Sequence, residues 1–284
     1  MPLTLRLKTE LILPVDADGL LPERLGVLTS NEIARLPLPQ GNRSIPCEEL
    51  FEVDGTAAED GELQIHGDCR KLKGIGAGMS TGRILVEGSA GMHLGRRMRG
   101  GEIVVTGDAS DWTGAEMRSG QIRVQGSVGH HAGGAYPGSK KGMTGGRLFV
   151  HGQAGTFVGN RMRRGWIVVL RSAEDAAGAG MVAGTICLLG GCHPEAAGSS
   201  LGVGMKRGTI LVGDNVVSSR LPRTFSFAAT ARPVFLNLLM KELHEAGFTV
   251  PAEWRSAPFD CYRGDSLERG LGELFFPHTQ SEPR

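Results

Sequence analysis

A repeated spacing of methionine and glycine constrains the fold of this chain more than any other feature. Glycine follows each of seven methionines by three residues, Ile or Leu by five, and Val or Leu by seven. The segment DGELQIHG at residues 60–67 matches without its methionine, giving eight copies from about residue 58 to residue 214. The methionines are 19, 19, 26, 19, 19 and 24 residues apart, at Met79, Met98, Met117, Met143, Met162, Met181 and Met205.

Each copy is too short to hold a helix, a strand and their connections, and its apolar residues alternate as in a strand. Glycine, at 44 of 284 residues, recurs where the chain must turn within one or two residues. We predict an all-β fold, a right-handed parallel β-helix (β-solenoid) of about eight 19-residue coils. At a strand spacing of ~4.8 Å this rod is roughly 35–40 Å long.

A second glycine pair accompanies the repeat, as in GMHLG at residues 91–95. The two long intervals then contain insertions, AYPGSKKG after Gly133 and part of GCHPEAA after Gly190. These insertions lengthen connections without disturbing the strand pattern.

The two ends of a solenoid expose strand edges, so caps are expected there. We predict an N-terminal cap at residues 1–57, the β-helix at 58–214, and a C-terminal cap or docking segment at 215–284. The first cap contains a strand that alternates Leu3, Leu5 and Leu7 with polar residues, and a short helix near residues 31–36. A helix at 233–246 starts at a proline and stops at Gly247. Its expected apolar face comprises Phe235, Leu238, Leu239 and Leu243.

Composition excludes several classes of protein. Thirty-one Lys and Arg against 30 Asp and Glu leave a net charge of +1, which gives no support for general binding of polyanions. No apolar run approaches the ~18 residues of a membrane helix, and the N-terminus alternates unlike a signal peptide. Five scattered cysteines without a CxxC pair indicate neither a zinc ribbon nor an iron–sulfur motif, and favour a reduced cytoplasmic setting.

Several motifs look catalytic but have a structural interpretation. GRRMRGG at residues 95–101 is a corner between coils, because no GxxxxGK[ST] leads into a helix. GSSLG at 198–202 matches a nucleophile elbow around Ser200, but other copies have no serine there. Asp108 and Asp111 lie too near a turn to indicate an acid–base pair. We assign no catalytic residue.

The histidines also do not predict a metal centre. His66 and His151 occupy one column but lie four coils apart, about 19 Å at the strand spacing above. His130 and His131 are adjacent, so alternation points them to opposite sides. The pair Cys192 and His193 could supply two ligands, but no third is evident. We assign no metal ligand.

Basic residues gather in the corners around the methionines, with Glu116 as the only acid. Stacked coils would align them as one positive edge, which we call the basic edge. Three interpretations stay open: solvated corners that deter edge pairing, a docking stripe for an acidic subunit, or a binding edge for a polyanionic cofactor. Nucleic acid is disfavoured because no aromatic residues interleave the arginines. The basic edge comprises Arg96, Arg97, Arg99, Arg118, Lys140, Lys141, Arg161, Arg163, Arg164, Lys206 and Arg207.

The repeat G-x-x-M-x-x-G-x-I-x-V-x-G resembles the glycine-rich β-helix domain of the glutamate synthase large subunit and of the C subunit of formylmethanofuran dehydrogenases. The run YPGSKKGMTGGRLFVHGQAGTFVGNRMRRGWIVV at residues 136–169 is most similar to the latter, as are PVFLNLLMKELHEAGF, YRGD and GLGELFF near the end. Glutamate synthase would place this domain in a far longer polypeptide than 284 residues, which argues against it.

The resemblance implies a subunit of an enzyme complex in one-carbon metabolism. In methanogenic archaea a tungsten or molybdenum enzyme reduces carbon dioxide to formylmethanofuran. In methylotrophic bacteria a related formyltransferase/hydrolase complex moves formyl from tetrahydromethanopterin to a methanofuran analogue and releases formate. High Arg, Gly and Ala usage favours the bacterial version. We therefore expect three partners, an amidohydrolase-like A subunit, a B subunit and a formyltransferase D subunit, and no nucleic acid or membrane.

By this resemblance the chain is a non-catalytic scaffold that binds no cofactor tightly, while the complex uses tetrahydromethanopterin and a polyglutamyl cofactor of the methanofuran type. The polyanionic tail of that cofactor motivates the hypothesis that the basic edge guides it between subunits. Two alternatives come from other classes: a stand-alone hydrolase using Ser200 or the insertions, and a glutamate-synthase-like structural module.

Overall fold

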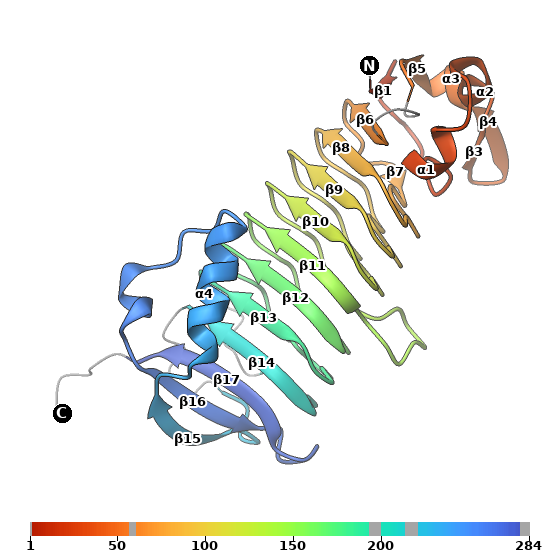
Figure 1. The fold of residues 1–284 in the computed structure, drawn as a ribbon. Coiled ribbons are helices and arrows are strands. Elements are labelled where there is room, and N and C mark those ends of the chain that lie inside the picture. The colour runs from red at the N-terminus through yellow and green to blue at the C-terminus, as the bar shows by residue number, and fades with distance from the viewer. Residues whose placement is uncertain (1, 57–60, 193–199, 214–220, 279–284) are drawn as a thin grey trace.

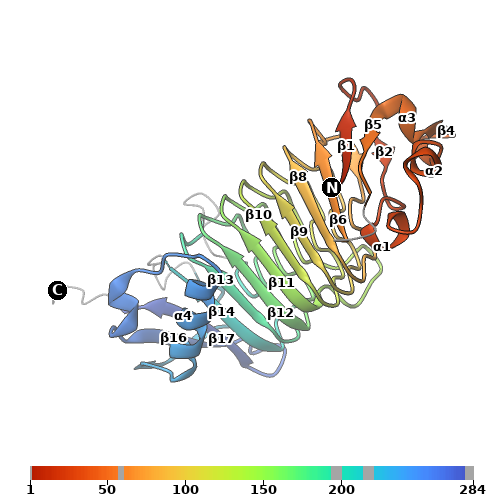
Figure 2. The same ribbon diagram turned by 45° about the horizontal axis from the view of Figure 1, so that its top comes forward.

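One long mixed β-sheet dominates the protein (Figures 1 and 2). The computed structural model describes residues 2–56, 61–192, 200–213 and 221–278. The sheet contains 13 strands in the order β15-β16-β17-β14-β13-β12-β11-β10-β9-β8-β6-β1-β5. The molecule is therefore mostly β and elongated, with strands lying across its length, and the sheet does not close into a barrel.

The eight sequence copies form eight consecutive parallel strands. They pair in register, so that Ile84, Ile103 and Ile122 are direct neighbours. The fixed spacing in the sequence thus becomes a fixed register in the sheet. The strands are β6 (Glu62–His66), β8 (Arg83–Glu87), β9 (Glu102–Val105), β10 (Gln121–Val124), β11 (Thr144–Val150), β12 (Arg164–Val169), β13 (Thr185–Leu188) and β14 (Arg207–Val212).

The repeated apolar residues all point to one interior. Ile103 and Val105 of β9 are completely buried, and so is Met98 in the preceding corner. The same positions are buried in the neighbouring copies, which confirms the prediction that the Ile and Val columns share one face. One hydrophobic core therefore runs along the stack.

Two glycine columns are required by close packing inside this core. Gly101 has φ +79°, and a Cβ there would lie 2.6 Å from the methyl carbon of Met79 in the preceding copy. Gly159 has φ +65°, and a Cβ there would lie 2.6 Å from Cδ1 of Ile186 in the following copy. Methionine, glycine and isoleucine thus recur together, because the methionine and isoleucine side chains of one copy fill the space beside the glycines of a neighbouring copy.

A second row of parallel pairing runs beside the main sheet. Single bridges connect successive copies, for example Ala90 with Ala109 and Ala109 with Val128. Side chains also bond across copies: the N–H of Ser127 donates to Asp108 (2.7 Å), and that of His130 donates to Asp111 (2.8 Å). These two aspartates satisfy backbone donors of the next copy, which explains their position near a turn.

The N-terminal segment adds strands and short helices at one end of the stack. β1 runs parallel to β6, and β5 pairs antiparallel with β1. Leu3 and Leu5 of β1 are buried, as the alternation predicted. A capping box of Thr29 and Glu32 begins α2. The elements are β1 (Leu3–Leu7), β2 (Val15–Asp16), α1 (Pro22–Leu25), α2 (Ser30–Ala34), β3 (Pro37–Gln40), β4 (Arg43–Pro46), α3 (Cys47–Leu50) and β5 (Phe51–Asp54). β2 pairs with β7 (Leu72–Lys73), which belongs to the first repeat copy.

The C-terminal segment closes the other end. β17 continues the parallel stack beside β14, and β16 and β15 follow it antiparallel. The buried carboxylate of Asp265 accepts hydrogen bonds from the N–H groups of Gly204 and Leu267, both at 2.9 Å, and so ties this segment to the last corner. The elements are β15 (Ser226–Ala231), α4 (Phe235–Glu245), the 3-10 helix η3 (Ala252–Arg255), β16 (Phe259–Gly264) and β17 (Leu271–Pro277).

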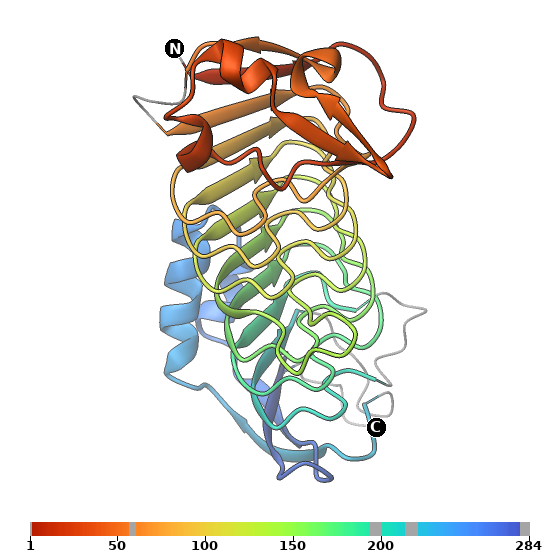
Figure 3. The ribbon, with the colours of Figure 1, turned by 90° about the vertical axis from the view of Figure 1, so that its right-hand side faces the viewer.

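Helix α4 packs against the outer face of β11 to β14 (Figure 3). It buries Leu236, Leu239, Met240 and Leu243 against that face. The face expected from the sequence is wrong in part, because Phe235 and Leu238 are 38% and 61% exposed. The helix has two leucine-rich stripes that could each be buried. The shape of the outer surface of the strands determines which of the two packs against it.

Candidate functional site

The basic edge lies in the turns that precede the strands and at the first residues of β12 and β14, which are Arg164 and Arg207. Nine of its members are exposed, while Arg96 and Arg163 are half-buried. The copy that leads into β13 has Val182 and Ala183 at the corresponding positions. The edge therefore runs from the corner before β9 to the start of β12, and Lys206 and Arg207 form a separate group.

Ion pairs neutralise part of this edge. Arg96 pairs with Asp18, Arg97 with Glu116 at 2.8 Å, and Lys206 with Glu268 at 3.1 Å. Within the described ranges no ion pair engages the other members, which are Arg99, Arg118, Lys140, Lys141, Arg161, Arg163, Arg164 and Arg207. The charge left for a partner thus lies on the corners before β9, β10, β11 and β12, with Arg207 apart at the start of β14.

The expectation that no aromatic residues lie among the arginines of the basic edge is wrong, since the guanidinium carbon of Arg97 lies 6.0 Å from the ring centroid of Tyr136. A stack of aromatic rings runs beside this edge. We call it the aromatic ladder: His93, Tyr136, Trp112, His131 and Phe157. Trp112 stacks on His131 with centroids 4.2 Å apart, and His131 stacks on Phe157 at 5.1 Å. Tyr136 stacks on Trp112 at 4.8 Å. Its hydroxyl lies 2.8 Å from Nδ1 of His93.

Four rings of the ladder belong to one column of the repeat. His93, Trp112 and Phe157 each lie five residues before a methionine, and His131 lies two before Gly133. This shared position was a signal in the sequence that would have identified the column. Tyr136 comes from the insertion after Gly133 and carries no periodic signal.

The ladder occupies strained backbone. His93, Trp112, His131 and Phe157 have φ between 59° and 66°, the left-handed region that ordinary side chains avoid. Gly74 occupies the same column earlier in the chain. A bulky residue in this region costs about 1–2 kcal/mol relative to glycine, so the rings strain the backbone. Their mutual stacking, worth about 0.5–1.5 kcal/mol a pair, offsets that strain.

The titratable rings of the ladder are held neutral at neutral pH. Burial lowers the pKa of His93 and of His131, and the positive charge of Arg96 lowers the pKa of His93 further. Burial raises the pKa of Tyr136 to about 12. The stack is therefore an uncharged, rigid surface flanked by cationic side chains.

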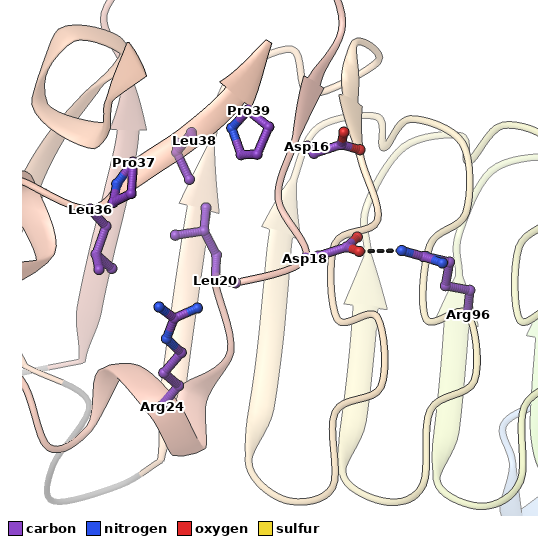
Figure 4. Close-up of a pocket in the computed structure, with 10 residues that line it drawn as sticks. Asp16, Asp18, Leu20, Arg24, Leu36, Pro37, Leu38, Pro39 and Arg96 are labelled. Carbon is purple, nitrogen blue, oxygen red and sulfur yellow. Dashed lines mark hydrogen bonds and ion pairs between the residues drawn. The ribbon is translucent and has the colours of Figure 1, made fainter. Parts of the chain in front are cut away.

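A pocket of about 310 Å³ lies at the N-terminal end of the same region (Figure 4). Arg96 connects it to the basic edge, because this side chain lines the pocket and pairs there with Asp18. Its polar lining also includes Asp16 and Arg24, and its apolar lining includes Leu38 and Pro39 of β3. The charges nearly balance, so the pocket offers no strong preference for an anion or a cation.

Comparison with known proteins decides the family. A sequence profile of the GXGXG motif family matches residues 71–223, more than half of the chain. The chain belongs to the GXGXG motif family. The matched range extends from β7 beyond β14 and includes the complete aromatic ladder.

The structure of this GXGXG protein matches a chain in the crystal structure of the formyltransferase/hydrolase complex (FhcABCD) from Methylorubrum extorquens in complex with methylofuran. The TM-score is 0.85 and the sequence identity 35%, over 97% of this chain and 100% of that chain. The likeness thus includes both ends outside the matched family range.

Curated relatives agree. The C subunit of a tungsten-containing formylmethanofuran dehydrogenase 2 from Methanococcus maripaludis is 36% identical over 92 residues, 32% of this chain and 34% of the relative. The C subunit of a molybdenum-containing formylmethanofuran dehydrogenase 1 from Methanosarcina barkeri is 37% identical over 90 residues, 31% and 30% of the two chains. The alignments span about a third of these relatives. The resemblance to the C subunit of formylmethanofuran dehydrogenases is confirmed.

Among the described residues of this GXGXG protein, the serine and histidines considered as catalytic or metal-binding candidates do not come together in one site. Ser200 lies in a turn where its carbonyl accepts from the N–H of Val203, and part of GSSLG lies outside the described residues. His66 pairs with Glu87 at 2.8 Å, while His151 stacks on Phe248. His193, which the sequence places beside Cys192, lies outside the described residues.

The adjacent histidines have different surroundings. The prediction that they point to opposite sides assumed an extended chain, whereas His131 has φ +59°. His131 belongs to the aromatic ladder, whereas Nδ1 of His130 accepts from the N–H of Thr156 at 3.0 Å. In the parts of the chain that the structure describes, no three His, Cys, Asp or Glu side chains come together as metal ligands do. The same parts contain no helix that is long and apolar enough to span a bilayer.

Proposed function

We propose that this chain is the non-catalytic scaffold subunit of a formyltransferase/hydrolase complex. That complex would transfer formyl from tetrahydromethanopterin to a methanofuran analogue and release formate. The observation that carries the proposal is the match over 97% of the chain to a chain of the FhcABCD complex. The partners would be an amidohydrolase-like A subunit, a B subunit and a formyltransferase D subunit.

The chain's own side chains support a scaffold role. Its distinctive surface features are a basic edge, a rigid aromatic ladder and a charge-balanced pocket. Each is suited to binding another molecule rather than to catalysing a reaction. The polar groups that resemble acid–base residues, such as Asp108 and Asp111, are used to hold neighbouring copies together.

For the architecture, we propose that each repeat is one coil of a right-handed parallel β-helix. The in-register parallel strands and the second row of bridges support this arrangement. We divide the chain into a cap at 1–57, the β-helix at 58–214 and a cap with docking surfaces at 215–284. Among the described residues Cys47, Cys69, Cys187 and Cys261 form no disulfide, which favours a reducing compartment, so we place the protein in the cytoplasm.

The proposed function is tested by purifying the tagged chain from its own cells under native conditions and identifying its companions by mass spectrometry. Recovery of an amidohydrolase-like protein, a formyltransferase and a B subunit would support it. Recovery of the tagged chain alone would contradict it and would direct attention to Ser200 and the insertions.

The second candidate is the C subunit of a tungsten or molybdenum formylmethanofuran dehydrogenase, which the names of the curated relatives favour. Companions with a molybdopterin or tungstopterin cofactor and iron–sulfur clusters would establish that version. Glutamine amidotransferase and flavoprotein companions would instead indicate a glutamate-synthase-like module.

The basic edge has two uses within this proposal. It would either guide the polyanionic tail of a methanofuran-type cofactor or bind a neighbouring subunit. Arg99, Arg118 and Arg164 are exposed and make no ion pair with described residues, so changing all three to Gln removes charge without breaking internal contacts. If the edge guides the tail, turnover of the intact complex slows and becomes less sensitive to salt. If it binds a subunit, the complex dissociates more readily.

A further inference from the structure

The insertion between Gly133 and Met143 forms a defined loop at the start of β11 (Figure 1). In the copy before β9, Gly95 and Met98 are three positions apart, whereas here the same step takes ten. We call residues 134–142 the insertion loop. It is the place where this region of the stack departs most from its own repeat.

Both halves of the insertion loop are fixed to the stack. Tyr136 stacks on Trp112 and bonds to His93, and its N–H donates to Glu116 at 3.4 Å. On the other side, the guanidinium of Arg161 donates to the carbonyl of Ser139 at 2.7 Å. These contacts reach from the copy before β9 to the copy before β12, so the loop is preorganised across several repeats.

The loop presents positive charge. Lys140 and Lys141 are exposed and form no ion pair with described residues. At the start of β11, just after the loop, a Cβ on Gly145 would collide with the carbonyl oxygen of Arg118, so the corner that carries this arginine borders the end of the loop. The carboxylate of Glu116 is already engaged by Arg97. The surface thus keeps an excess of positive charge.

The same loop carries apolar ring surface through Tyr136, and the guanidinium carbon of Arg97 lies 6.0 Å from the centroid of that ring. Trp112 and Tyr136 are half-buried, and Phe157 at the end of the ladder is 38% exposed. Tryptophan, tyrosine and arginine are the residues that dominate the affinity of protein interfaces, and charged groups around them select a complementary partner. A flexible polyanion would use the lysines but would leave the rings without a role.

We propose that the insertion loop and the aromatic ladder form a preorganised docking surface for a partner protein that presents carboxylates around an apolar patch. This rests on the proposed function, since the partner is a subunit of the same complex. The ladder supplies the rigid apolar centre, and Lys140, Lys141 and Arg118 supply the cationic rim. Rigidity matters because a loop ordered before binding loses less entropy on binding.

The test uses the complex purified from cells that carry a variant of this chain. The complex is diluted in buffers of increasing salt concentration. At each salt concentration, mass photometry measures the fraction of complexes that have lost this chain. Replacing Lys140 and Lys141 together by Gln should weaken the affinity about tenfold at low salt, as expected for two exposed ion pairs. The difference should shrink as salt rises. The matched control replaces Arg35 and Arg43 together by Gln. These are two exposed cations of the N-terminal segment that form no ion pair with described residues, so dissociation should be unchanged.

A second pair of variants tests the ladder separately. Tyr136→Ala releases the loop and should weaken the complex at least as much as the lysine pair, whereas Tyr136→Phe keeps the stacking and should weaken it less. Variants that dissociate at the same salt as the wild type would overturn the proposal. An intact complex whose turnover alone loses salt dependence would also overturn it, in favour of a polyanionic cofactor. Failure of even the wild-type chain to assemble would contradict the proposed function itself.

Discussion

The hydroxyl of Tyr136 lies 2.8 Å from Nδ1 of His93, which joins two residues 43 positions apart in the sequence. This contact exists only because the insertion loop folds back along the stack toward earlier copies. It turns a column of rings and an irregular insertion into one continuous surface.

Gly159→Ala should lower the free energy of unfolding by about 2–4 kcal/mol, because the new Cβ meets Cδ1 of Ile186 and the backbone has φ +65°. Gly41→Ala is the matched control, since φ is +62° there but no atom lies within 4 Å. It should lose only the backbone contribution, about 1 kcal/mol. Urea denaturation measures both, and equal losses would contradict the packing argument.

The two adjacent leucines of α4 should respond very differently to truncation. Leu239→Ala should destabilise the protein by about 2–4 kcal/mol, because Leu239 is buried against β11 to β14. Leu238→Ala should change stability by no more than about 0.5 kcal/mol, since that side chain is 61% exposed. The reverse order in denaturation would show that the other stripe of the helix is buried.

Acidification should destabilise the aromatic ladder. Burial keeps the pKa of His131 below the ordinary 6.5, so the folded chain binds fewer protons there than the unfolded chain. The free energy of unfolding should then fall as the pH drops below about 6.5. His131→Phe keeps a stacking ring and should reduce this fall. Urea midpoints between pH 7.5 and pH 5 measure the effect, and identical pH profiles would refute it.

The cysteines should differ sharply in reactivity toward a thiol reagent in the native protein. Burial raises the pKa of Cys47, Cys69 and Cys187 to about 12, so their thiolates are scarce and inaccessible. Cys192 is half-buried and should react first. Mass spectrometry after brief labelling identifies the modified residue, and rapid modification of Cys187 would contradict the burial of its thiol.

What the sequence determined by itself is the part of the fold that depends on local spacing. The steps from Met98 to Gly101, Ile103 and Val105 recur in every later copy, with Leu in place of Ile or Val at two positions. Stacking such copies in register is the arrangement that buries the methionine, isoleucine and valine side chains of every copy. The same register predicted one basic edge, but the copy before β13 has no basic residue in that corner, so Lys206 and Arg207 form a separate group. The partial neutralisation of the edge did not follow from the register, because Arg96 meets Asp18 from a segment 78 residues away.

Only the tertiary structure decided the rest. The buried stripe of α4 depends on the outer surface of four strands, and that surface does not exist until the copies have stacked. The aromatic ladder needed Tyr136 to reach Trp112 and His93 from an insertion outside the repeat. Contacts of this kind join positions that have no fixed separation in the sequence. A periodic sequence pattern therefore cannot predict them.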